Sequence, residues 1–386
     1  MKLLKGQSSK KRKNRMSDYR HFLMKAGLYD HATTQERFLN AVKKNIERQM
    51  DGSDRYRDIL MSLSFVPDDL KTTDDIGRIP PIPTLFFKRN EIFSVDEKKL
   101  KIKATSSGTT GSRSVVGFDL KTLYYGIRMA LKTFRYHGIL SPRKVNYILL
   151  GYEPSDTDKR GAVKTAAYTT RMTRRGKIDY FLRFRDGSFV NNIEGLIKTL
   201  DEYSHSSRPV RFVGFPGFLN ELADELIKRN RSYVFDMRSM VLLGGGWKGL
   251  SGSRISSDEL ANKVYRCFGI REDRIVEFFS AVEHPVAYVK CRCGHFHMPV
   301  CSKVIARDIR TLEPVGDGEE GILNFITPLV DSMPLISVLT DDIGTVFYGN
   351  KCDCGNVSPY FTLSGRVGIG DIVTCSNEAV NQLKNG

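Results

Sequence analysis

The sequence contains a Ser/Thr/Gly-rich segment, residues 104–114, whose residue types suit the binding of phosphate groups. Two glycines let the backbone approach a ligand, and the serine and threonine hydroxyls stand beside backbone N–H groups that can bind phosphate oxygens. No Gly-Lys-Ser/Thr follows, so the segment is not a Walker A loop, and a simple turn is the alternative. The candidate ligand-binding residues are Ser106, Ser107, Gly108, Thr109, Thr110 and Gly111.

Two Cys-x-Cys-Gly elements could bind a metal ion. The first contains Cys291 and Cys293 and is followed by His297, and the second contains Cys352 and Cys354. Together they supply more than enough soft ligands for tetrahedral Zn²⁺, and the glycines allow tight turns that bring both thiolates of a pair to one ion. We expect a structural zinc bound by Cys291, Cys352 and Cys354, with His297 or Cys293 as the fourth ligand.

Two further glycine-rich segments have different interpretations. Gly244, Gly245 and Gly246 follow the apolar run 240–243, and ligands of α/β proteins bind at the carboxyl ends of such strands. Residues 316–321 fit G-x-G-x-x-G, but three carboxylates would repel a pyrophosphate and the motif precedes a strand. We therefore expect a hairpin turn at 316–321 and a ligand contact at 244–246.

These segments must be positioned by an α/β fold. Residues 17–66 are predicted to be helical, with a capping box formed by Thr33 and Glu36. Between residues 100 and 279, short β-rich runs alternate with amphipathic stretches, which predicts βαβ units and a mostly parallel sheet. After residue 286 strand follows strand, as in 335–339 and 345–348, which predicts a β-rich subdomain.

Composition narrows the class of protein. The chain has 386 residues, of which 40% are apolar and 27% charged, so a disordered chain and an integral membrane protein are both excluded. Residues 1–20 carry +7 of the net charge of +16, which predicts a solvated basic tail; weak binding of nucleic acid or acidic lipid is the alternative. Seven cysteines, mostly clustered, favour metal binding in a reducing compartment, and we expect a cytoplasmic protein.

Taken in order, the motifs resemble the adenylate-forming superfamily of acyl-CoA ligases, luciferase-type enzymes and peptide-synthetase adenylation domains. The Ser/Thr/Gly segment is similar to its phosphate loop. The other motifs are Gly-Gly-Gly-Trp-Lys248, Phe279-Ser-Ala-Val-Glu283, Thr340-Asp-Asp342 and Gly365-Arg366. The resemblance spans about residues 75–375 and is closest to the long-chain acyl-protein synthetases, the synthetase component of bacterial fatty-acid reductase. Their features correspond here to residues 79–88, Val213-Gly-Phe-Pro216, and Glu283-His-Pro285 followed by Gly294-His-Phe-His297.

The resemblance implies an adenylate-forming-enzyme-like body with a very short C-terminal segment, and it implies a role for each motif. The hydroxyls around Thr109 would hold the triphosphate of ATP, and Glu283 would ligate Mg²⁺. Asp342 would bind the ribose hydroxyls, Arg366 would contact ribose or phosphate, and the glycines at 244–246 would lie beneath adenine. The resulting division of the chain is a basic tail (1–17), a helical segment (18–78), a nucleotide-binding body (79–284), a β-rich subdomain with zinc (285–364) and a hinge with a short tail (365–386).

The implied reaction is ATP-dependent activation of a carboxylic acid, here a fatty acid, with release of pyrophosphate. The family carries a tail cysteine that takes the acyl group, and Cys375 corresponds to it; a tail thiol without function is the alternative. Lys248, Lys88 and Arg113 are candidates for the cation that assists adenylation. A reductase, transferase or carrier protein would accept the acyl group. The alternatives are a coenzyme A ligase or acyltransferase of the same fold, and a zinc-dependent nucleic-acid-binding protein.

Overall fold

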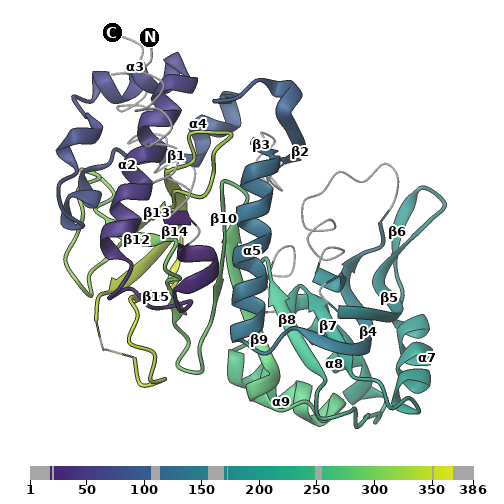
Figure 1. Cartoon of the computed structure of the whole chain (residues 1–386). Coiled ribbons are helices and arrows are strands. Elements are labelled where there is room, and N and C mark those ends of the chain that lie inside the picture. Colours follow the sequence, from purple (N-terminus) through teal and green to yellow (C-terminus); the bar gives the residue numbers. More distant parts are fainter. Residues whose placement is uncertain are drawn as a thin grey trace. The chain divides into compact units, whose positions relative to one another are not determined.

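The computed structural model describes residues 18–19, 21–105, 114–154, 169–171, 173–247, 254–349 and 352–367. The chain forms two compact units, Met1–Tyr136 with Ala281–Gly386, and His137–Ser280 (Figure 1). The N-terminal helices and the C-terminal β-rich region therefore belong to one unit, called the first unit, and the central α/β region forms the second unit. Among the described residues, no helix is long and apolar enough to cross a membrane.

A mostly parallel sheet forms the centre of the second unit. Its strand order is β9-β8-β7-β4-β5-β6, in which β6 runs antiparallel to β5 and the other neighbours are parallel. The bounds are β4 Ser141–Tyr152, β5 Thr173–Arg185, β6 Ser188–Asn191, β7 Val210–Gly214, β8 Met240–Gly244 and β9 Ile275–Ala281. The predicted alternation of strands and helices is confirmed here, because apolar runs such as 210–213 become buried central strands.

Three helices pack on one face of this sheet and enclose its hydrophobic core (Figure 1). They are α7 Ile193–Ser204, α8 Pro216–Lys228 and α9 Ser257–Phe268, followed by the short 3₁₀ helix η6 Glu272–Arg274. Helix α9 begins where the Ser256 side chain accepts a hydrogen bond from the Glu259 N–H and ends at Gly269, whose φ of 65° suits glycine. Leu219 and Leu222 of α8 are fully buried against the strands.

A mostly antiparallel sheet built around one long strand forms the centre of the first unit. Its order is β11-β15-β14-β13-β12, and β14 also pairs with β16, antiparallel, and with β1, parallel. The bounds are β1 Ile82–Pro83, β11 Phe296–His297, β12 Lys303–Arg307, β13 Glu320–Ile326, β14 Ser337–Phe347, β15 Tyr360–Phe361 and β16 Gly365–Arg366. The two strands predicted at 335–339 and 345–348 are thus one strand, β14. Of the hairpin turn predicted at 316–321, the structure has a turn directly before β13, in which the Glu319 N–H donates to the Gly316 carbonyl at 3.1 Å, while residues 320 and 321 already belong to β13.

Helices and a hairpin complete the first unit. The hairpin of β2 Leu100–Thr105 and β3 Val115–Asp119 flanks the Ser/Thr/Gly segment, and β10 His284–Val289 packs on α5. The helices are η1 His21–Lys25, α2 Gln35–Gly52, α3 Asp54–Ser62, η2 Pro67–Asp69, η3 Asp74–Arg78, α4 Thr84–Arg89, η4 Glu97–Lys99 and α5 Leu120–Tyr136.

The predicted capping box at the start of α2 is wrong. The helix begins one residue later, with Thr34 at the cap position and no side-chain cap hydrogen bond. The Thr33 hydroxyl instead donates to Asp30 Oδ2 at 2.7 Å, and the Thr33 N–H donates to the other carboxylate oxygen of Asp30 at 3.3 Å. An aspartate turn therefore takes both polar groups of Thr33, and they are not available to cap the helix.

Candidate functional site

The predicted metal ligand Glu283 lies in the turn that precedes β10 and is almost completely buried, with 5% of its surface exposed. Its Oε1 accepts a hydrogen bond from the hydroxyl of Ser114, which is fully buried directly before β3. A buried carboxylate needs hydrogen bonds or an opposite charge to offset the loss of water. Ser114 supplies the hydrogen bond. Arg366 supplies the opposite charge, since attraction to Glu283 is among the causes that raise the pKa of Arg366.

Asp342 and Arg366 are brought together by the pairing of β14 with β16. The two residues are partners in the antiparallel register, and Arg366 Nε lies 2.8 Å from Asp342 Oδ1. Burial raises the pKa of Asp342, and the Arg366 guanidinium opposes this shift. Burial lowers the pKa of Arg366, but attraction to Asp342, Asp341 and Glu283 outweighs it and raises the pKa overall. The arrangement places a buried carboxylate, an acceptor of hydrogen bonds, next to a guanidinium cation. Such a pair suits binding of a diol and a nearby phosphate.

His284 follows Glu283 and is held by hydrogen bonds of its own. Its Nε2 lies 2.7 Å from the Tyr288 hydroxyl, which also contacts the Ser302 hydroxyl, and all three side chains are buried. Burial lowers the pKa of His284 to about 3, so the imidazole is neutral at physiological pH. The first residue of β10, and with it the backbone of Glu283, is therefore fixed by a buried hydrogen-bond network.

In the second unit, the predicted glycines stand at the carboxyl end of a central strand. β8 ends at Gly244, and Gly245 and Gly246 have φ values of 79° and 66°. A Cβ on Gly245 would lie 2.5 Å from Cε1 of Phe215, the residue that follows β7. Only glycine fits this combination of backbone and neighbour, so the turn presents bare backbone next to an aromatic ring. Such a surface can accept a flat aromatic ligand.

Four of the five predicted zinc ligands come together in the first unit. The ligand atoms of Cys291, His297, Cys352 and Cys354 all lie within 4.8 Å of one another, whereas Cys293 is not in this group. The Sγ atoms of Cys291 and Cys352 are 3.7 Å apart, and tetrahedral zinc with Zn–S bonds of about 2.3 Å places two thiolates roughly 3.8 Å apart. The donor set and its spacing therefore fit Zn²⁺.

Hydrogen bonds and burial act on three of these four side chains. The Nδ1 of His297 lies 3.0 Å from the Ser358 hydroxyl and its Nε2 lies 3.2 Å from Cys354 Sγ, so donation from Nδ1 leaves Nε2 as the ligand atom. Burial lowers the pKa of His297, which keeps it neutral, and burial raises the pKa of Cys291 and Cys352. A bound cation would displace the thiol protons.

Sequence reasoning missed three polar residues beside these sites. His295 Nδ1 lies 3.2 Å from Cys352 Sγ, and the His295 ring stacks on Tyr360 with the ring centres 4.3 Å apart. The other two are Ser114 and His284. All three belong to motifs that the sequence shows: Ser114 ends the Ser/Thr/Gly segment, His284 lies within Glu-His-Pro, and His295 lies within Gly-His-Phe-His. Residue type alone did not distinguish them from their neighbours.

The remaining predicted residues divide into two groups. Lys88 lies in the last turn of α4. The others lie outside the described residues; they are Ser106, Ser107, Gly108, Thr109, Thr110, Gly111, Arg113, Lys248 and Cys375.

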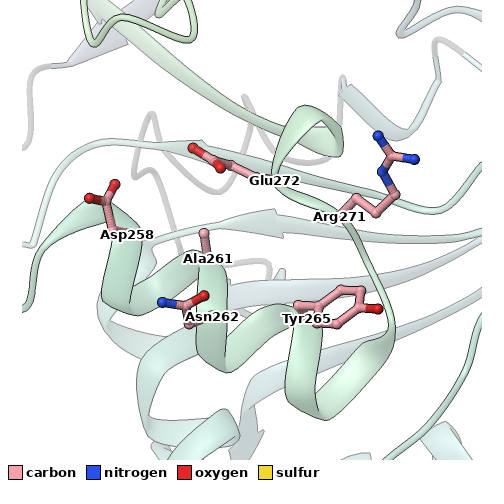
Figure 2. Close-up of a pocket in the computed structure, with 6 residues that line it drawn as sticks. All are labelled: Asp258, Ala261, Asn262, Tyr265, Arg271 and Glu272. Carbon is pink, nitrogen blue, oxygen red and sulfur yellow. The ribbon is translucent and has the colours of Figure 1, made fainter.

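An open surface hollow of about 210 Å³ in the second unit is unrelated to the motifs. Figure 2 shows its lining side chains, which come from α9 and the segment that follows it: Asp258, Ala261, Asn262, Tyr265, Arg271 and Glu272. Its charged lining groups are two carboxylates and one guanidinium, and none of the predicted site residues lines it. We assign no part of the reaction to it.

Comparison with known proteins agrees with the motifs. The profile of the LuxE acyl-protein synthetase family matches residues 30–383. The long-chain-fatty-acid–luciferin-component ligase of Aliivibrio fischeri is 25% identical over 304 residues, 76% of this chain and 75% of the relative. The protein of the same name from Vibrio harveyi is 21% identical over 283 residues, which are 72% of this chain and 71% of the relative.

The fold is that of adenylate-forming ligases. The chain superposes on a crystal structure of 2-hydroxyisobutyryl-CoA ligase in the postadenylation state, with 2-HIB-AMP bound, with a TM-score of 0.65 at 15% identity, covering 87% of this chain and 68% of that one. An open conformation of the same enzyme superposes with a TM-score of 0.66 at 15% identity, and the match covers 90% of this chain and 77% of that one. The predicted fold class is confirmed, and the match gives no support to the nucleic-acid-binding alternative. By its family profile, this chain belongs to the LuxE acyl-protein synthetases.

Proposed function

We propose that the protein activates a long-chain fatty acid with ATP and passes the acyl group through a thioester to a partner. In the first step a fatty-acid carboxylate oxygen attacks the α-phosphorus of ATP. The bond from that phosphorus to the bridging oxygen breaks, and pyrophosphate leaves with the electron pair. Membership of the acyl-protein synthetase family supports this reaction, and the relatives named as long-chain-fatty-acid ligases support the substrate class.

The observation that carries the proposal is a group in the first unit in which Ser114, Glu283 and Asp342 are buried and the exposed Arg366 pairs with Asp342. Glu283 would hold Mg²⁺, which when bound neutralises negative charge on the phosphates. Asp342 would accept hydrogen bonds from the ribose hydroxyls. Arg366, exposed and paired with Asp342, would offer its remaining N–H groups to the nucleotide.

Other motif residues would complete nucleotide binding. The residues 244–246 would lie beneath adenine, because their bare backbone leaves room for a flat ring. The hydroxyls of 106–111 would hold the triphosphate. Lys248 would supply the cation that assists the attack, and Lys88 and Arg113 are the alternatives. Each assignment rests on the family's motif and on the residue's chemistry.

The second step of the proposal transfers the acyl group to Cys375. The thiolate attacks the acyl carbonyl, the bond between that carbon and the phosphate oxygen breaks, and AMP leaves. A thiol on a reductase, transferase or carrier protein would then accept the acyl group by the same exchange of thioesters. Coenzyme A is the alternative acceptor, favoured by the ligase whose fold the chain shares.

We also propose that Cys291, His297, Cys352 and Cys354 hold a structural Zn²⁺. The spacing of their ligand atoms supports it, as does the absence of a place for substrate in a complete set of four protein ligands. The ion would join the turn before β11 to the turn before β15. Thiolate ligands require a reducing environment, which agrees with a cytoplasmic location.

The test of the activity is ATP–pyrophosphate exchange by the purified protein with short, long-chain and aromatic carboxylic acids. We expect exchange with long-chain acids, retained in Cys375→Ser. With labelled acid and ATP, wild-type protein should carry a thioester that hydroxylamine removes, and Cys375→Ser should not. Exchange with another acid class would overturn the substrate assignment, and equal labelling of both proteins would overturn the role of Cys375.

A further inference from the structure

The contact between Ser114 and Glu283 joins two motifs that are 169 residues apart in the chain. Ser114 is the last residue of the Ser/Thr/Gly segment, and Glu283 belongs to the motif with the predicted metal ligand. Both side chains are buried, at 0% and 5% exposure. Among the described residues, Ser114 is the one that donates a hydrogen bond to this carboxylate. The orientation of the carboxylate therefore depends on this hydroxyl.

Glu283 has little freedom in its backbone, so its side chain is what remains to be oriented. His284 is fixed by the Tyr288 hydroxyl at 2.7 Å and lies 3.4 Å from the Ser302 hydroxyl. This network holds the start of β10, directly after Glu283. The side chain of a glutamate has three rotatable bonds beyond its backbone, and a hydrogen bond to one oxygen selects among their rotamers.

We propose that Ser114 is a positioning residue that orients the Glu283 carboxylate for the metal of the nucleotide complex. It takes one lone pair of Oε1 and leaves the remaining acceptor sites of the carboxylate for a cation. It also ties the end of the Ser/Thr/Gly segment to the metal ligand, so that phosphate binding and metal binding depend on one contact. Outer hydrogen-bond partners of metal ligands typically change metal affinity by about 10- to 100-fold. The inference rests on the proposed function of Glu283.

The experiment measures Mn²⁺ binding to the full-length protein with a non-hydrolysable ATP analogue, from the electron paramagnetic resonance signal of free Mn²⁺. Ser114→Ala should weaken Mn²⁺ binding about tenfold. Ser94→Ala is the matched control, because Ser94 is also a buried serine of the first unit and its hydroxyl has no hydrogen-bond partner among the described residues. This control should bind Mn²⁺ like the wild type. Equal Mn²⁺ affinity in Ser114→Ala and wild type would overturn the proposal.

Two further comparisons separate positioning from a loss of structure. Threonine and valine have the same shape and differ in the hydroxyl group. The Ser114→Thr variant should therefore bind Mn²⁺ more tightly than the Ser114→Val variant, and equal affinities would contradict the inference. In a Glu283→Gln background, Ser114→Ala should change Mn²⁺ affinity by less than about twofold, since coupled residues are not additive. A full tenfold loss in that background would show that Ser114 acts by another route.

The same proteins distinguish this inference from the proposed function. If the wild type catalyses fatty-acid-dependent exchange and Ser114→Ala has unchanged Mn²⁺ affinity, only the positioning role fails. If the wild type binds Mn²⁺ with the ATP analogue in a Ser114-dependent way but catalyses no exchange, adenylation fails and the positioning role stands.

Discussion

Replacing Cys352 with serine should remove the zinc and destabilise the first unit by about 4 kcal/mol. Cys291 and Cys352 are 61 residues apart in sequence with their sulfur atoms 3.7 Å apart, so an ion that joins them closes a long loop. The loop-closure relation used for cross-links gives about 4 kcal/mol for a loop of this length. At roughly 2 °C per kcal/mol for a domain of this size, the melting temperature should fall by about 8 °C.

The assay combines metal analysis by mass spectrometry with thermal unfolding. Wild-type protein should contain one zinc per chain, and a strong chelator should lower its melting temperature to that of Cys352→Ser while leaving the variant unchanged. Cys293→Ser is the matched control, because Cys293 is outside the group of four, and it should keep both zinc and stability. A Cys352→Ser variant that retains the wild-type melting temperature, or wild-type protein purified without zinc at full stability, would refute the reasoning.

Two other substitutions test the nucleotide-binding residues. Gly245→Ala should lower the free energy of unfolding by about 1–3 kcal/mol more than Gly246→Ala does. Both positions have positive φ, but only a Cβ at Gly245 would lie 2.5 Å from a Phe215 ring atom. Chemical denaturation measures both losses, and equal losses would contradict the packing argument. Asp342→Asn should weaken ATP binding about 10- to 100-fold, measured by calorimetry, because it removes a charged acceptor. The same variant should be more stable than wild type at neutral pH. The folded pKa of Asp342 is raised, so the wild type loses stability as the pH rises above 3.8, and the difference in melting temperature should disappear below that pH.

The elements that the sequence predicted are those with uninterrupted apolar runs or clear helical periodicity. The apolar run 240–243, for example, forms most of strand β8, Met240–Gly244. Strand β5 offers no such run, because charged residues such as Arg174 and Arg175 interrupt its apolar pattern. Its one buried charge, Asp179, pairs with Arg183 of the same strand at 2.5 Å and accepts a hydrogen bond from the Thr199 hydroxyl at 2.5 Å. Thr199 belongs to α7, which lies near β5 only after folding.

In the candidate site too, local sequence predicted some features and contacts between distant segments determined the others. The cysteine pairs were predicted from spacing, since a Cys-x-Cys-Gly turn determines its own local geometry. The choice of His297 over Cys293 as the fourth member of the cluster depended on the pairing of β11 with β15, which places His297 opposite Tyr360. Likewise, the contact between Ser114 and Glu283 joins segments from the hairpin and from the turn before β10, and no local pattern indicates it. Contacts between segments that are distant in the sequence therefore determined the fourth member of the cluster and the partner of Glu283.

The central claim is that the protein forms an acyl-adenylate from a long-chain fatty acid and ATP. The most direct measurement is mass-spectrometric detection of the acyl-AMP after the purified protein is mixed with Mg²⁺, ATP and a long-chain acid. The Cys375→Ser variant should accumulate the intermediate, since it lacks the proposed acceptor, whereas Glu283→Ala should form at least about 100-fold less. Absence of acyl-AMP in wild type and Cys375→Ser alike, with folded protein that binds ATP, would contradict the account.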